Sequence, residues 1–339
     1  MREVQDRQFR RVAAVHPQWE GDLLLSDIDN TLRHESHGSR GTYRLSSGTL
    51  HVAWERFPAE DFVDINGLYV HESLARNLRQ RQPDPMPQSG LTRAGGHHPF
   101  PIQVVSLRRT QARRQHFVAM NPGVHFEFFD AVDGYAVDKT KFFGSPLADA
   151  DIPYTPGAVG CALSHLALWE KCAGAQRPMT IVEDDSVLRL DFPQKSLEVI
   201  ARLPSDWDLI MWGWNFDSLL SINAMPGISS VVLLCDQAAL RQSIRRFQVQ
   251  LLEPRIFPLD KCFGTCAYSI SPAGASKFRQ NCFPLKNVSV RFPNIARNLP
   301  NNGIDIAMNR IYPMTNSYVS VPPLVITPNV NAESLTLTP

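Results

Sequence analysis

Residues 179–188 read MTIVEDDSVL, a short apolar stretch that runs directly into three acids. The length and apolarity of residues 179–182 predict a buried strand, which places Glu183, Asp184 and Asp185 at its carboxyl end. Ligands bind at this edge of an open α/β sheet, so the acids are expected to face a crevice. Because side chains alternate along an extended chain, Glu183 and Asp185 should point to one side and Asp184 to the other.

Three crowded carboxylates repel one another and raise their own pKa values unless a cation lies among them. A hard divalent cation, Mg²⁺ or Mn²⁺, relieves this repulsion and can also bridge the two phosphates of a nucleotide. A second interpretation is a solvated turn in which Asp185 or Ser186 caps the segment that follows. The triplet alone does not decide between a metal site and a cap.

The segments around the triplet alternate between strand and helix patterns, which is typical of an α/β domain. The clearest helix covers residues 159–172, where apolar residues recur at i, i+3, i+4 and i+7, and Gly174 is expected to end it. Residues 315–339 carry no strong signal. Further strands are expected at 102–107, 126–130, 208–212 and 264–270, and further helices at 110–119, from about 194 and at 271–280.

Composition shifts predict the division of the chain into domains. Residues 83–99 are rich in Pro, Gly and His and predict a linker. Before it, residues 1–82 alternate short apolar runs with turn residues, which predicts a small antiparallel β module. After it, residues 100–328 form the α/β domain, and residues 329–339 form a tail.

The overall composition favours a soluble protein. The 34 Lys and Arg residues balance the 33 Asp and Glu residues, so no nucleic-acid partner is expected. The charged start of the chain and the lack of a long apolar run argue against a secretory signal and a transmembrane segment. The six cysteines predict reduced thiols rather than a disulfide framework. We therefore expect a cytoplasmic protein, at most peripheral at the inner face of the membrane, and leave its oligomeric state open.

Six motifs occur in an order that resembles glycosyltransferase family 25, which holds bacterial lipooligosaccharide galactosyltransferases and collagen galactosyltransferases. The resemblance covers residues 100–328, and the segment before residue 83 lies outside it. The motifs are PIQVVSLRRTQARRQHF (101–117), FEFFDAVDG (126–134), GAVGCALSHLALWEKC (157–172), TIVEDDSVL (180–188), WDLIMWG (207–213) and FGTCAYSISPAGASKF (263–278).

The resemblance implies a GT-A type fold, with a mainly parallel sheet and helices on both faces. It implies transfer of a sugar, usually galactose, from a UDP-sugar donor to a hydroxyl of a glycan or glycoprotein acceptor. Such a reaction would serve the synthesis of cell-surface polysaccharide, lipooligosaccharide or protein glycans. The expected cofactor is Mn²⁺ or Mg²⁺, and the expected stereochemistry is inverting, which requires a carboxylate base for the acceptor hydroxyl.

The resemblance also implies roles for individual residues. Asp185 would be a direct metal ligand, with Glu183 beside it near the ribose or a metal-bound water. Asp305 is the first candidate for the base, ahead of Asp217 and Asp260. The residues expected around the nucleotide sugar are Ser106, Leu107, Arg108, Arg113, Asp133, Ser164, His165, Glu183 and Asp184.

Several of these residues have a simpler interpretation. The arginines after residue 107 could form a solvent-exposed basic helix face, since surface charges are common. His165 could be a packed core histidine, and Asp133 could belong to an Asp-Gly turn. Three aromatic residues close to strand ends could stack on sugar rings or pack in the core, namely Trp212, Trp214 and Tyr268.

Two alternatives belong to other functional classes. Residues 23–32, LLLSDIDNTL, look like the nucleophile motif of haloacid-dehalogenase-type phosphatases, with Asp27 as nucleophile and Asp29 as acid and base. A β pattern follows where that fold needs a helix, which favours a β-turn at DIDN. The third possibility is a noncatalytic carbohydrate-binding protein, in which a β module with Trp19, Tyr43 and Trp54 holds glycan.

Overall fold

The computed structural model describes residues 9–65, 67–80, 100–292 and 295–330. The chain divides into two units, which we describe separately. The expected linker, 83–99, lies outside the described residues, as does almost all of the expected tail. Two short segments that the sequence placed in the second domain group instead with the first unit, namely 189–191 and 242–251.

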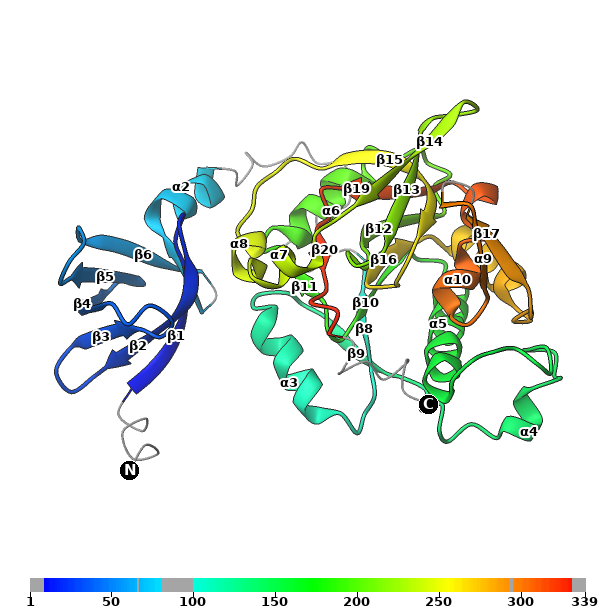
Figure 1. Ribbon diagram of the computed structural model, residues 1–339, viewed down its shortest axis with the longest axis horizontal. Helices are drawn as coiled ribbons and strands as arrows, with labels where there is room; N and C mark the ends of the chain where they lie inside the picture. Colours follow the sequence, from blue (N-terminus) through cyan, green and yellow to red (C-terminus); the bar gives the residue numbers. More distant parts are fainter. Residues whose placement is uncertain (1–8, 66, 81–99, 293–294, 331–339) are drawn as a thin grey trace. The chain divides into compact units, whose positions relative to one another are not determined.

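The first unit contains a closed barrel of seven strands (Figure 1). Each strand pairs antiparallel with the next, and β1 closes the barrel by pairing parallel with β7. The expected β module is thus confirmed as β structure, but its parallel seam was not predicted. The strands are β1 (Phe9–Val15), β2 (Glu20–Ser26), β3 (Thr31–His34), β4 (Arg40–Ser46), β5 (Thr49–Trp54), β6 (Glu60–Ile65) and β7 (Leu68–His71), followed by helix α2 (Glu72–Gln80).

The phosphatase-like motif forms the hairpin between β2 and β3. Asp29 accepts hydrogen bonds from the backbone N–H and the hydroxyl of Thr31, and Asn30 adopts a positive φ of 55°. Asp27 is exposed and accepts a hydrogen bond from the Tyr43 hydroxyl at 2.6 Å. Because a strand follows the motif where the phosphatase fold needs a helix, the phosphatase alternative is wrong.

The barrel aromatics pack against one another. Trp19 lies 5.7 Å from Phe62 and 6.3 Å from Trp54 between ring centroids, and Tyr43 is buried in the same cluster. The indole N–H of Trp54 donates to the carboxylate of Glu60. These side chains therefore build the barrel core, which does not support their use as a sugar-binding platform.

The second unit is built on a sheet of nine strands in the order β14-β13-β15-β19-β12-β16-β10-β8-β9. Among the described residues, three neighbouring pairs are parallel and five are antiparallel, so the expected mainly parallel sheet is wrong and the sheet is mixed. Its strands are β8 (Ile102–Ser106), β9 (Glu127–Asp130), β10 (Met179–Glu183), β12 (Leu209–Gly213), β13 (Leu219–Met225), β14 (Ser229–Leu234), β15 (Arg255–Cys262), β16 (Ala267–Ile270) and β19 (Ser317–Val321).

Two small sheets and several helices complete the chain. The small sheets pair β11 (Val187–Leu188) with β20 (Val325–Ile326) and β17 (Ser289–Phe292) with β18 (Arg297–Pro300). None of the described helices is long and apolar enough to cross a bilayer. The helices are α3 (Gln111–Met120), α4 (Lys139–Phe142), α5 (Pro156–Ala175), α6 (Phe192–Ile200), α7 (Gln237–Arg241), α8 (Ile244–Gln248), α9 (Pro272–Cys282), α10 (Ile304–Met308) and the 3₁₀ turn η3 (Tyr312–Met314).

Helices pack against both faces of the nine-stranded sheet (Figure 1). Side chains alternate along β10, so Ile181 joins the core with Trp169 of α5, whereas Val182 joins the core with Phe117 of α3 and Phe192 of α6. The expectation of an α/β unit with helices on both faces is confirmed, while the GT-A topology stays a proposal.

Helix α5 is longer than its apolar stripe predicted. Thr155 caps its start by accepting the N–H of Ala158, and Pro156 occupies the first turn. The helix ends at Gln176, whose φ of 50° is left-handed. Gly174 therefore lies inside the helix, and the expectation that it ends α5 is wrong.

The loop after β9 packs tightly on the start of α5. A Cβ atom on Gly160 would lie 2.4 Å from the carbonyl oxygen of Val132 and 2.7 Å from the nitrogen of Gly134. The Ser164 hydroxyl receives the N–H of Val132 at 2.9 Å and donates to the Gly160 carbonyl at 2.7 Å. This contact fixes the position of residues 131–135.

We predict that alanine has opposite effects at two glycines of α5. Gly160→Ala should destabilise the second unit by roughly 1–3 kcal/mol, because the added methyl overpacks against backbone atoms. Gly174→Ala should stabilise it by up to about 1 kcal/mol, because the methyl meets no atom within 4 Å and alanine favours a helix. Urea unfolding measures both values, and equal effects of the two substitutions would contradict the packing.

The barrel should lose stability in acid through His34. Its imidazole is 2% exposed, and burial lowers its pKa from 6.5 to about 4. The unfolded chain therefore binds a proton that the folded barrel excludes, so stability falls as the pH drops from 6.5 towards 4, by up to about 3 kcal/mol. Calorimetric unfolding from pH 7 to pH 4 should show a flatter decline for His34→Gln, and an unchanged decline would refute the assignment.

Candidate functional site

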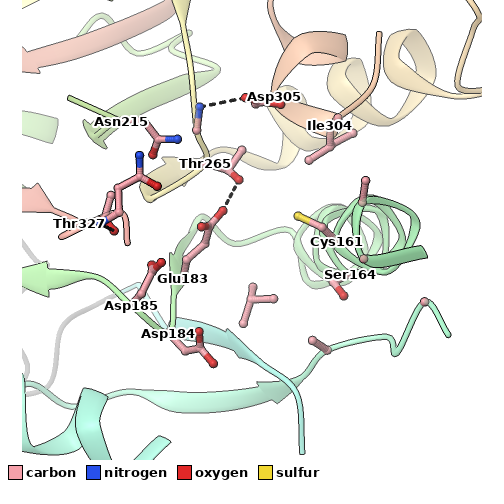
Figure 2. A pocket seen from close by; sticks show the side chains of 18 of the residues that line it. Cys161, Ser164, Glu183, Asp184, Asp185, Asn215, Thr265, Ile304, Asp305 and Thr327 are labelled. Atoms are coloured by element: carbon pink, nitrogen blue, oxygen red, sulfur yellow. Dashed lines mark hydrogen bonds between the residues drawn. The ribbon is translucent and has the colours of Figure 1, made fainter. Parts of the chain in front are cut away.

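A cleft of about 610 Å³ opens where β8 and β10 end. These two strands are parallel, as are β8 and β9, so their carboxyl ends meet at one edge of the sheet. The far wall comes from residues 215–218, 263–265 and 299–306. Figure 2 shows the acid triplet on one side of this cleft, with Cys161 and Ser164 of α5 on another.

The three acids of the triplet divide as the alternation predicts. Asp184 accepts hydrogen bonds from the Ser106 hydroxyl at 2.6 Å and from Nε of Arg113 at 2.9 Å. Glu183 instead accepts a hydrogen bond from the Thr265 hydroxyl. In Figure 2, Glu183 and Asp185 point to one side of the chain and Asp184 points to the other.

Glu183 and Asp185 form an electrostatic deficit. Burial, and then the charges of Asp185, Asp184 and Asp305, raise the pKa of Glu183 to about 8. Burial also raises the pKa of Asp185, whose Oδ1 is buried without a hydrogen-bond partner. The nearest guanidinium is that of Arg113, 3.7 Å from Asp185, but it binds Asp184 at 2.5 Å. The arrangement therefore lacks positive charge.

These residues fit a hard divalent cation. A cation between Glu183 and Asp185 would supply the missing charge and a partner for the free Oδ1. Among the described residues, no three carboxylates have oxygens within 4.8 Å of one another, so the protein would offer two carboxylates. That number suits Mg²⁺ or Mn²⁺, which usually take one or two carboxylates together with phosphate oxygens of the substrate.

The predicted basic residues separate into two groups. Arg113 borders the cleft, as does Arg109, which pairs with Asp133 at 2.7 Å and lowers the pKa of that carboxyl. Arg108 is exposed and does not border the cleft, so its predicted place beside the nucleotide is not met. Arg114 pairs with Asp130 and donates to the Ser106 carbonyl, which braces the end of β8.

His165 does not border the cleft as predicted. Its imidazole is fully buried, and its Nδ1 lies 2.7 Å from the Tyr268 hydroxyl, which also receives the indole N–H of Trp169. Trp212 and Trp214 are buried as well. The expected stacking of sugar rings on Trp212, Trp214 and Tyr268 is therefore not met, because all three rings belong to the core.

The three candidate bases lie in different surroundings. Asp305 borders the cleft, where its carboxylate accepts the N–H groups of Gly264 at 3.0 Å and Ile306 at 2.9 Å, and burial raises its pKa. Asp217 also borders the cleft but is exposed. Asp260 lies on β15, bonded to Ser221 and Lys261, outside the cleft.

The cleft thus brings together most of the predicted residues. Its lining includes Ser106, Leu107, Arg113, Asp133, Ser164, Glu183, Asp184, Asp185, Asp217 and Asp305. Sequence reasoning missed four polar residues that also border it, namely Cys161, Asn215, Thr265 and Thr327. Asn215 and Thr327 directly follow the strand ends of β12 and β20, a position that could have indicated them as it indicated the acids.

Comparison with known proteins identifies the second unit. The family described as glycosyltransferase family 25 (LPS biosynthesis protein) matches residues 100–290. A glycosyltransferase 25 family member of Aedes aegypti is 31% identical over 156 residues, which are 42% of this chain and 25% of the relative. The inactive glycosyltransferase 25 family member 3 of Mus musculus is 29% identical over 42% of this chain and 26% of its own.

Another relative carries a more specific name. Procollagen galactosyltransferase 2 of Mus musculus is 26% identical over 128 residues, which are 33% of this chain and 20% of the relative. The chain spans about a quarter of the length of the curated relatives that it matches. The family match covers more than half of the chain and includes the acid triplet, both arginines of the cleft and the start of α5. The chain therefore belongs to glycosyltransferase family 25.

Proposed function

We propose that the protein is a metal-dependent glycosyltransferase that moves galactose from UDP-galactose to a hydroxyl of a glycan or glycoprotein acceptor, with inversion. The observation that carries this proposal is the pair Glu183 and Asp185, buried at the end of β10 with too little positive charge. A cation bound with a nucleoside diphosphate is the ligand that this pair suits.

The nucleotide side of the cleft is formed by β8, β9 and the start of α5. Glu183 and Asp185 would hold the cation, which stabilises the charge of the departing diphosphate when it is bound. Arg109 and Arg113 would bind phosphate oxygens with their guanidinium groups. The loop 131–135, held by Ser164 and Gly160, would border the ribose or the base.

The opposite side of the cleft would take the acceptor. Asp305 is the base that we favour, because it borders the cleft and its carboxylate is fixed by two backbone N–H groups. It would accept the proton of the acceptor hydroxyl as that oxygen attacks the anomeric carbon. Asn215 and Asp217 would orient the acceptor through hydrogen bonds.

The comparisons support the choice of sugar and acceptor class. One relative is named a procollagen galactosyltransferase, which supports galactose and a protein acceptor, whereas the family description names LPS biosynthesis, which supports a cell-surface glycan. All six cysteines are free, which supports action in a reducing compartment such as the cytoplasm.

Metal-dependent nucleotide binding should require Asp185. In calorimetric titrations of UDP with Mn²⁺, Asp185→Asn should weaken UDP binding by more than about tenfold, because metal sites lose that much even when an outer partner is removed. Asp260→Asn should bind UDP as the wild type does, since this acid lies outside the cleft. Wild-type affinity in Asp185→Asn would contradict the assignment.

Turnover should depend on Asp305. Asp305→Asn should lower kcat by roughly 10²–10⁴-fold, the range of a lost general base, and should leave UDP affinity unchanged. Asp260→Asn is again the matched control. Release of UDP from UDP-galactose in the presence of an acceptor measures kcat. Because some relatives are named inactive, a wild type that binds UDP with Mn²⁺ but transfers no sugar would identify a noncatalytic protein.

A further inference from the structure

A second cluster of metal-ligating side chains lies in the wall of the cleft. Cys161 and His165 are four residues apart on α5 and therefore share one face of the helix. One ligand atom of each lies within 4.8 Å of the other and of a carboxylate oxygen of Glu183. Cys161 and Glu183 border the cleft, whereas His165 is buried. The cluster is therefore open to the cleft on one side.

The imidazole of His165 shows that a partner is missing from this cluster. Its Nε2 is buried without a hydrogen-bond partner, whereas its Nδ1 is held by Tyr268. Buried side-chain nitrogens almost always have a partner, so this one needs an explanation. Burial also lowers the pKa of His165 to about 4, so the ring is neutral near pH 7, which is the form that binds metals.

We propose that Cys161, His165 and Glu183 form a binding site for a soft divalent cation such as Zn²⁺. A thiolate, an imidazole nitrogen and a carboxylate are the ligands that zinc takes, with a fourth position left for water from the cleft. Hard cations prefer oxygen ligands, so Mg²⁺ and Mn²⁺ would avoid this set. The site is distinct from the pair Glu183 and Asp185, although it shares one residue with it.

Zinc binding changes the protons of the cluster. The Cys161 thiol loses its proton to solvent as the zinc–sulfur bond forms, because a coordinating thiol is deprotonated. In the free protein, Tyr268 receives the Trp169 N–H and donates its hydroxyl proton to Nδ1, which leaves the histidine proton on Nε2. On binding, Nε2 gives up its proton to the metal's place and Nδ1 carries one, donated to the tyrosine oxygen. This hydrogen bond then orients the ring, as outer-shell partners of metal-bound histidines do.

Sharing Glu183 has a functional consequence that rests on the proposed function. A carboxylate bound to zinc in this cluster is no longer available to the cation that accompanies UDP. Zinc should therefore inhibit metal-dependent UDP binding at concentrations that saturate the cluster. The zinc site itself is testable without any transferase activity.

Cobalt titration of the full-length protein tests the site. Co²⁺ bound to a thiolate gives a charge-transfer absorption band, and we expect one equivalent of Co²⁺ to produce it and Zn²⁺ to remove it. Cys161→Ser should abolish the band, and His165→Gln should weaken Co²⁺ binding by at least about tenfold. Cys235→Ser, which changes a half-buried thiol outside the cluster, should leave the band unchanged.

Three outcomes would overturn the proposal: no band in the wild type, a band that persists in Cys161→Ser, or equal loss in Cys235→Ser. If Cys161→Ser does not fold by circular dichroism, alkylation of the wild type decides, since Zn²⁺ should slow modification of Cys161 relative to Cys235. Equal rates with and without Zn²⁺ would refute the site. Asp185→Asn should keep the cobalt band while losing Mn²⁺-dependent UDP binding, which separates this proposal from the proposed function.

Discussion

Like charge buried at the end of one strand is the constraint on which the cleft depends. β10 runs between β8 and β16, so its last residue, Glu183, leaves the sheet at a fixed point. Arg113 could have neutralised the acids, but it is bound to Asp184 and cannot serve Glu183 and Asp185 to the same extent. Uncompensated buried charge costs stability, and proteins keep such an arrangement where a ligand relieves it.

Periodic segments of the sequence predicted the elements that carry this constraint. The apolar stripe of α5 and the short run before Glu183 were sufficient, because both elements are buried and bounded by clear signals. Strand neighbours could not be predicted in this way. β19 lies between β12 and β15 although its segment carries no strong pattern, and the seam between β1 and β7 joins residues far apart in sequence. Apolar periodicity shows which residues are buried but not which strand lies beside them.

The same limit applies to the site. Alternation along the chain correctly separated Asp184 from Glu183 and Asp185, because it is a local property. The partner of Asp184, Arg113, is 71 residues away, so its role in bracing that acid was not visible. Asp260 and Asp305 looked equivalent in sequence, and only their tertiary positions separate an acid outside the cleft from one inside it. His165 was misplaced for the same reason.

The position of β19 also bears on the order in which the chain acquires its structure during synthesis. The barrel has all of its strands once residue 71 has emerged, and none of them has a free edge. The nine-stranded sheet differs, because residues 317–321 separate β12 from β15. Until they are made, β12 and β15 both expose unpaired edges, and such edges are prone to wrong pairing. The growing second unit therefore has its greatest exposure to aggregation just before translation of β19, while the barrel ahead of it can already be closed.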